Sequence, residues 1–210
     1  MPRPDRHRAA LISNTAQLLR RRGYAATGLT DILDGANATN GSLYHHFPGG
    51  KEELALAALE ASSASVEETL RTALDKATDV GSALARWLDG PIAAMRADPR
   101  DGCPVAPVAL EATHSSDTLR LAAAAAFARW RDVIETALAR TRDPATAARQ
   151  ARVAIAAIEG ALLLDRAAHG TEHLEALRAD IASLLSAPGG QTSVPAPGRK
   201  VPTNAAVSPQ

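Results

Sequence analysis

The stretch from Lys51 to Lys76 constrains the fold most strongly. It reads KEELALAALEASSASVEETLRTALDK and holds neither proline nor glycine. Its larger apolar residues recur at helical spacing, at Leu54, Leu56, Leu59, Val66, Leu70 and Leu74. Strands are indicated by alternating runs of Val, Ile and Tyr bounded by hairpin turns, and we find no such run in the sequence. The sequence therefore predicts an all-α protein built around one long helix.

Similar patterns predict eight further helices. Helical spacing and stop signals place them over residues 5–22, from a Thr30 cap to a stop at Asn37, and over about 40–47, 82–95, 104–114, 117–140, 144–169 and 172–185. Gly90-Pro91 should kink the helix over 82–95, because proline has no N–H for the helical ladder. Pro48 should end the short helix over 40–47, because the residue before a proline avoids helical geometry.

Composition favours a cytoplasmic protein held together by packing. The chain has 210 residues, and 46% of them are apolar, many being alanine. We find no apolar run of about 18 residues that could cross a bilayer, and the N-terminal sequence does not resemble a secretory signal. Cys103 is the one cysteine, so an internal disulfide is excluded. We expect no membrane association.

Charge divides the chain although the net charge is zero. Residues 1–51 carry seven Lys or Arg against three Asp, whereas the remainder carries 16 basic and 20 acidic residues. Such asymmetry is typical of a basic module joined to an acidic body. We therefore predict a domain over 1–50, a second over 51–186, and a disordered tail over 187–210, where five Pro and three Gly interrupt any periodicity.

The stretch NGSLYHHFPGGKEEL, residues 40–54, is the candidate functional motif. Two short helices separated by about three residues, behind a longer support helix and within a basic segment, form a helix-turn-helix arrangement. A two-turn helix can enter a DNA major groove, read base edges and meet phosphates near its ends. The predicted DNA contacts are Thr27, Thr30, Asn40, Gly41, Ser42, Leu43, Tyr44, His45 and Lys51.

The segment GYAATGLTDILDGANATNGSLYHHFPGGKEEL resembles the DNA-binding signature of the TetR family of transcriptional regulators. The resemblance covers about residues 8–56 and implies a nine-helix fold, a homodimer formed through the last two helices, and an effector pocket in the C-terminal body. GCPVAPVALEA, residues 102–112, is similar to the LmrA/YxaF-like branch. Asn40 departs from the family pattern, in which Lys is frequent, so operator sequences of relatives do not transfer.

Three polar features admit competing interpretations. His45 and His46 are adjacent and point to different faces of a helix, and they lack a third ligand at metal spacing, so we predict no metal. Cys103 has His114 eleven residues on but no orienting third group, so we predict no catalysis, no cofactor and no enzyme. The run Arg20 to Arg22 is either a solvated helix end or a DNA contact.

The body holds a few large aromatic and sulfur-containing side chains. Their presence there suggests an apolar pocket with few polar groups, although core packing would also explain it. The candidate pocket residues are Trp87, Met95, Cys103, Glu111, His114, Phe127 and Trp130. The last two helices should pair in a homodimer as a four-helix interface. Its candidate residues are Ile155, Ile158, Leu162, Leu177, Ile181 and Leu184.

These features favour a ligand-responsive, dimeric transcriptional regulator, a repressor released from a pseudo-palindromic operator by a small apolar or aromatic effector. Its expected partners are double-stranded operator DNA, a small-molecule effector and a second copy of the chain. The alternatives are a helical enzyme or small-molecule-binding protein, and a nonspecific DNA binder. Binding to specific and scrambled duplexes would separate these hypotheses, because only the transcriptional regulator requires sequence preference.

Overall fold

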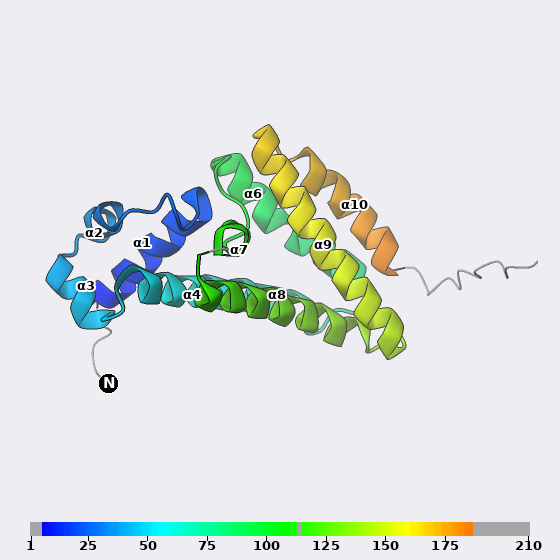
Figure 1. Ribbon diagram of the computed structural model, residues 1–210. Coiled ribbons are helices and arrows are strands. Elements are labelled where there is room, and N and C mark those ends of the chain that lie inside the picture. Colours follow the sequence, from blue (N-terminus) through cyan, green and yellow to red (C-terminus); the bar gives the residue numbers. More distant parts are fainter. Residues whose placement is uncertain (1–5, 113–114, 187–210) are drawn as a thin grey trace, which may run out of the picture.

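A computed structural model describes residues 6–112 and 115–186, and all regular structure in these ranges is helical (Figure 1). Ten helical segments follow one another: α1 (Arg6–Arg22), α2 (Leu29–Ala36), α3 (Asn40–His46), α4 (Gly50–Leu74), α5 (Val80–Trp87), α6 (Asp89–Ala97), α7 (Ala106–Ala112), α8 (Asp117–Leu138), α9 (Pro144–Ala168) and α10 (Glu172–Ser186). The predicted all-α fold is confirmed. The predicted tail over 187–210 lies outside the described residues.

Segments α5 and α6 are two halves of one interrupted helix. The break falls at Leu88, which keeps right-handed helical backbone angles, directly before Gly90-Pro91. Pro91 cannot donate to the carbonyl of Trp87, so the ladder is broken where the sequence predicts a kink. Counted as one kinked helix, α5 and α6 bring the total among the described residues to the predicted nine.

The ends of the two short helices follow local chemistry. Asn37 ends α2 in the left-handed conformation (φ 48°, ψ 48°), as predicted. The Thr39 hydroxyl caps α3 by accepting from the Ser42 N–H at 3.2 Å. Phe47, before Pro48, leaves helical geometry at φ −137°. The predicted Thr30 cap is wrong: the cap position is taken by Gly28, two residues earlier, so Thr30 lies within the first turn of α2.

A small separate core holds the first three helices against the start of α4. Its fully buried members include Leu11 of α1, Ile32 of α2, Leu43 of α3 and Leu54 of α4, with Phe47 beside them. Each of the four helices contributes one fully buried leucine or isoleucine, so truncating any of them would leave a cavity in this small core. Packing at this point sets the angle at which α3 faces outward.

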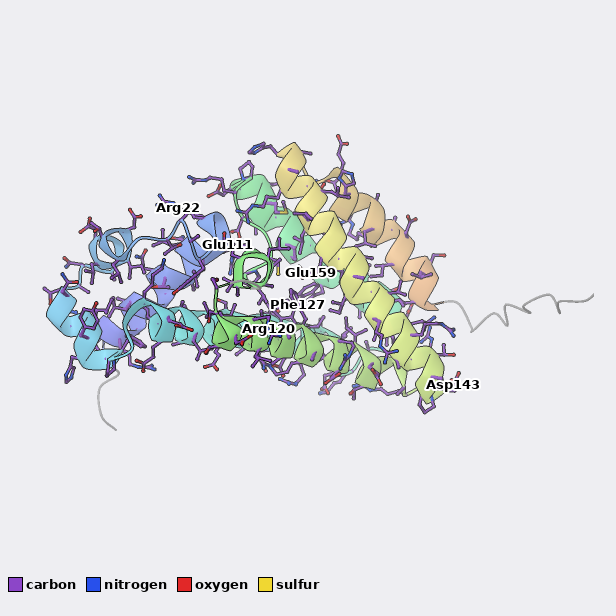
Figure 2. All side chains as sticks on the ribbon, in the orientation of Figure 1. Arg22, Glu111, Arg120, Phe127, Asp143 and Glu159 are labelled. Atoms are coloured by element: carbon purple, nitrogen blue, oxygen red, sulfur yellow. The ribbon has the colours of Figure 1, made fainter. Side chains whose placement is uncertain are left out.

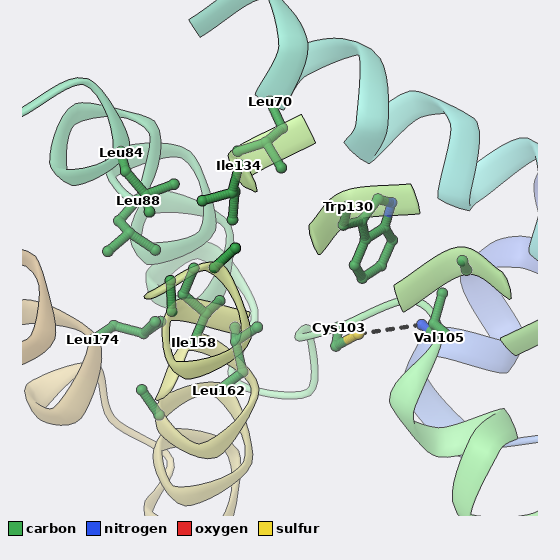
Figure 3. Close-up of a cluster of buried hydrophobic side chains, with 14 of the residues drawn as sticks. Leu70, Leu84, Leu88, Cys103, Val105, Trp130, Ile134, Ile158, Leu162 and Leu174 are labelled. Carbon is green, nitrogen blue, oxygen red and sulfur yellow. Dashed lines mark hydrogen bonds between the residues drawn. The ribbon is translucent and has the colours of Figure 1, made fainter. Parts of the chain in front are cut away.

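The long helix α4 joins this module to the body. In Figure 1 the module of α1 to α3 lies at one end, α4 and α8 run side by side along one edge, and α9 and α10 cover the opposite side. The body core contains leucines of α4 and α5, Trp130 and Ile134 of α8, and Ile158 of α9 (Figure 3). Because α4 packs on both α1 and α8, it connects the module to the body.

Candidate nucleic-acid interface and internal cavity

The outer face of α3 carries four of the predicted DNA contacts. Asn40, Gly41, Tyr44 and His45 are exposed, and the first two precede the last two by three to five residues, which brings the two pairs to the same side of the helix. The Tyr44 side chain is 51% exposed although it is aromatic. Ser42 is half-buried, and its main-chain N–H donates to the Thr39 hydroxyl. The motif thus presents amide, phenol and imidazole groups together at one end of the molecule.

Two predicted contacts are wrong because their side chains are buried. Leu43 has no exposed surface and belongs to the small core, so it holds α3 in place. Thr27 is also fully buried, and its hydroxyl donates to the Gly23 carbonyl at 2.6 Å. The hydroxyl therefore closes the turn between α1 and α2. Thr30, by contrast, is exposed on the first turn of α2.

Lys51 points back to the turn between α1 and α2. Its ammonium donates to the Tyr24 carbonyl at 2.8 Å and lies 4.3 Å from the centre of the Tyr24 ring. Partial burial lowers the pKa of this amine from its usual value, with the charge of Glu111 acting in the opposite direction. Lys51 therefore ties the start of α4 to the module, a role that the sequence pattern did not indicate.

Tyr44 and Gly50 are in close approach where α3 meets α4. Gly50 has φ +68°, and a Cβ atom there would lie 3.3 Å from Cε1 of Tyr44. Glycine accepts this left-handed backbone without steric cost. The glycine therefore sets both the chain direction after Pro48 and the position of the exposed phenol.

Asn14 holds α2 on the support helix. Its side-chain amide donates to the carbonyls of Asp31 at 3.2 Å and of Ile32 at 2.9 Å. Gly35 makes room for it, since a Cβ atom there would lie 2.5 Å from the Asn14 amide. These contacts, together with the small core, fix the relative position of α2 and α3.

The arginines at the end of α1 bind acidic side chains of the protein. Arg20 pairs with Asp101 at 3.2 Å, Arg21 with Asp98 at 2.9 Å, and Arg22 with Asp31 at 3.2 Å. Asp101 and Asp98 belong to the segment between α6 and α7, so the first two pairs join the module to the body. Arg20 and Arg21 are therefore engaged with the body, whereas Arg22 and its partner Asp31 both remain exposed, and part of the basic charge of residues 1–51 is neutralised internally.

Two further contacts from the body reach the same region. Arg166 of α9 donates to the main-chain carbonyls of Arg20 at 2.8 Å and Arg21 at 2.6 Å. Glu111 of α7, which Figure 2 labels near Arg22, accepts from the Ala25 N–H at 2.7 Å and lies against Gly23. The sequence assigned Glu111 to the pocket and missed Arg166, because contacts over such chain separations leave no local signal.

The body contains an apolar cavity of about 340 Å³. Four predicted pocket residues line it, namely Trp87, Met95, Cys103 and Trp130, together with residues of α4, α9 and the loop after α6. Figure 3 shows Trp130, Cys103 and Ile158 around this region. The indole N–H groups are already satisfied, by Thr69 Oγ1 at 3.1 Å for Trp87 and the Ser63 carbonyl at 3.0 Å for Trp130. The tryptophans therefore offer the cavity aromatic surface.

Three of the predicted pocket residues are not among the described residues that line the apolar cavity. Phe127 packs edge-on against Trp130, with ring centroids 5.5 Å apart, and so supports the wall from behind. Glu111 is engaged at the module interface as described. His114 lies outside the described residues.

Glu159 of α9 is the polar wall residue that the sequence analysis missed. Burial raises the pKa of its carboxyl to about 7, and Cys103 is its hydrogen-bond partner. The Cys103 sulfur accepts from the N–H groups of Val105 and Ala106, each at 3.3 Å, and burial raises the pKa of the thiol. A lone carboxylate in the apolar run AIAAIEGALLL was a signal that could have found Glu159.

The predicted dimer residues divide between interior and surface. Ile158, Leu162 and Ile181 are buried within the protomer, while Ile155 and Leu177 are half-buried against the same core. Ile155, Ile158 and Leu162 line the cavity, so their side chains face the interior of the protomer. Leu184 alone of the six is largely exposed, at 51%.

No group of three or more His, Cys, Asp and Glu side chains within residues 6–112 and 115–186 is arranged to hold a metal ion. None of the helices in those ranges is long and apolar enough to cross a membrane.

The three-helix module, with its exposed α3 face, defines a helix-turn-helix transcriptional regulator. Residues 11–58 match the family described as bacterial regulatory proteins of the tetR family, and residues 81–180 match the LmrA/YxaF-like C-terminal domain of transcriptional regulators. The chain is 31% identical to the HTH-type transcriptional regulator LmrA of Bacillus subtilis, over 85% of this chain and 96% of that protein. The protein belongs to the TetR family of transcriptional regulators, as the sequence resemblance indicated.

Other relatives agree over most of the chain. An uncharacterised HTH-type transcriptional regulator of Mycobacterium tuberculosis, Rv0196, is 31% identical over 86% of this chain and 94% of its own. A crystal structure of a TetR transcriptional regulator from Chloroflexus aurantiacus superposes with a TM-score of 0.72 at 28% identity, covering 87% of this chain and 96% of that one. The match therefore extends through both the module and the body.

Proposed function

We propose that the protein is a dimeric, ligand-responsive repressor that leaves a pseudo-palindromic operator when a small apolar or aromatic effector fills the body cavity. Such a protein acts on genomic DNA and is therefore cytoplasmic. The α3 face would read the major groove through Asn40, Gly41, Tyr44 and His45. Asn40 suits adenine, because its amide can donate to N7 and accept from the N6 amino group.

The single observation that supports ligand response is that the Arg20–Asp101 ion pair belongs to two places at once, the cavity wall and the contact between α1 and the body. Both residues line the cavity, and the pair also joins the end of α1 to the body. A ligand in the cavity therefore meets the connection that holds the helix-turn-helix. An effector that binds one orientation of the module more tightly than another shifts the population between them.

Dimerisation is proposed through an exposed apolar stripe on α9 and α10. The stripe contains Val153, Leu163 and Leu164 of α9 and Leu184 of α10, each about half exposed. Two exposed alanines of α9, Ala156 and Ala167, continue it. Four such helices can form a bundle. Two α3 helices held by that bundle would meet successive turns of a major groove, about 34 Å apart.

A binding assay with matched DNA tests this function. Fluorescence anisotropy with the region upstream of the gene and a scrambled duplex should show sequence preference at moderate salt. Tyr44→Ala should weaken specific binding and leave the dimer intact, whereas Leu121→Ala, an exposed change on α8, should alter neither. Equal affinity for both duplexes would reject the repressor and favour a nonspecific DNA binder.

A further inference from the structure

The charged side chains that line the cavity are not all paired with opposite charges in the described part of the chain. Arg20 and Asp101 neutralise one another at 3.2 Å, although a buried Nε–H of Arg20 has no acceptor. Glu159 forms no ion pair within the described residues; Cys103 is a hydrogen-bond partner of its carboxyl group, but the buried Oε2 atom has no hydrogen-bond partner there. Figure 2 places Glu159 on α9, at the level of α7 in the middle of the body. An orphaned carboxyl oxygen in an apolar cavity is a site for a donor that the protein does not supply.

The rest of the wall defines the body of the ligand. Trp87 and Trp130 present aromatic surface, and Ile134, Ile155 and Met95 add aliphatic surface. The volume of about 340 Å³ is near the lower end of the range of ligand pockets, roughly 300–1,000 Å³. Indole rings also attract cations over their faces. The space therefore suits a compact aromatic ligand.

Resting on the proposed effector function, we propose that the ligand class is an aromatic or apolar amine, bound with its ammonium group against the carboxylate of Glu159. Ionised Glu159 would leave the cavity with one uncompensated negative charge, which an ammonium balances. An alcohol would satisfy Oε2 but not the charge. A carboxylate ligand would accept a hydrogen bond from the free Nε–H of Arg20, but the carboxylates of Glu159 and Asp101 would repel it.

Three probes of one shape separate these cases: 2-(1-naphthyl)ethylamine, 2-(1-naphthyl)ethanol and 1-naphthylacetic acid. The chain has two tryptophans, and both line the cavity, so quenching of their fluorescence reports occupation directly. The amine should bind wild-type protein at least about tenfold more tightly than the alcohol, as expected for a charge-assisted hydrogen bond. Glu159→Gln should remove that preference, while Glu60→Gln, an exposed change on α4, should keep it.

The outcomes are separable from those of the proposed function. Equal binding of amine and alcohol, tighter binding of the acid, absence of quenching by the amine, or a preference that survives Glu159→Gln would each overturn the ligand class. Circular dichroism of Glu159→Gln checks that the variant is folded. Selective amine binding that leaves operator affinity unchanged would support the ligand class and reject the regulatory function.

Discussion

The guanidinium of Arg166 on α9 donates to the main-chain carbonyl of Arg20, at 2.8 Å, and so caps the C-terminal end of α1. The same guanidinium reaches the Arg21 carbonyl at 2.6 Å. The last turn of a helix leaves carbonyls without partners and carries partial negative charge, which a cation stabilises. A residue of the proposed dimer helix therefore holds the support helix of the DNA-binding module.

Removing this cap should destabilise the protein. Arg166→Ala leaves two carbonyls without their charged donor, and we expect the free energy of unfolding to fall by about 2 kcal/mol. Urea unfolding followed by circular dichroism measures the change. Arg152→Ala, an exposed arginine on the same helix, is the control and should have little effect. A loss no larger than that of the control would show that the cap contributes nothing.

Gly50 should not tolerate a side chain. Gly50→Ala places a Cβ atom in left-handed backbone at φ +68° and 3.3 Å from the Tyr44 ring. We expect a loss of about 1–2 kcal/mol in thermal or urea unfolding, together with weaker DNA binding as Tyr44 shifts. Gly90→Ala meets no atom within 4 Å and should stay within about 0.5 kcal/mol of wild type. Equal stability of the two variants would be inconsistent with this geometry.

Glu159 should make stability fall as pH rises. Burial raises its pKa from 4.5 to about 7 in the folded protein, so the neutral acid is favoured there. Below the unfolded pKa both states are neutral and the group costs nothing. Between the unfolded and the folded pKa the unfolded state releases a proton that the folded state keeps, so the unfolding free energy falls by about 2 kcal/mol from pH 5 to pH 8 and levels off above the folded pKa.

Glu159→Gln removes this titration. Relative to wild type, the variant should gain about 2 kcal/mol in unfolding free energy between pH 5 and pH 8. The cavity groups Arg20 and Asp101 remain in both proteins, so their contribution cancels in the comparison. Parallel pH profiles for the two proteins would mean that the carboxyl is not buried in solution.

The proposed dimer surface can be tested by charge. Replacing both Leu163 and Leu164 with Glu puts like charges on each partner at the centre of the stripe, and we expect a monomer in analytical ultracentrifugation. Leu121→Glu changes an equally exposed leucine on α8 and should remain dimeric. If the double variant remains dimeric, the dimer interface does not lie on this stripe.

Local chemistry predicted the helices well. Asn37, Pro48 and Gly90-Pro91 act on their own backbone or on the next few residues, so their effects were visible in the sequence. Thr30 was misplaced as a cap because an exposed threonine suits either the cap or the first turn, and Gly28 took the cap position.

Burial at the site was harder to predict. Leu43 and Tyr44 are adjacent in the same motif, yet one lies in the small core and the other faces outward, as the helical rotation requires. Helix α9 has apolar residues on two faces, so periodicity could not tell whether Ile158 or Leu163 meets the protomer core. The contacts of Arg166 and Glu111 join distant parts of the chain, and only the fold brings them together.

Selection from a pool of random DNA duplexes tests the central claim most directly, because it needs no knowledge of the regulated gene. Wild-type protein should enrich an inverted repeat whose half-site centres lie about one helical turn, or a multiple of it, apart. Asn40→Lys should change the preferred base within each half-site. A pool that stays random after repeated rounds, with wild-type protein folded and dimeric, would contradict the account.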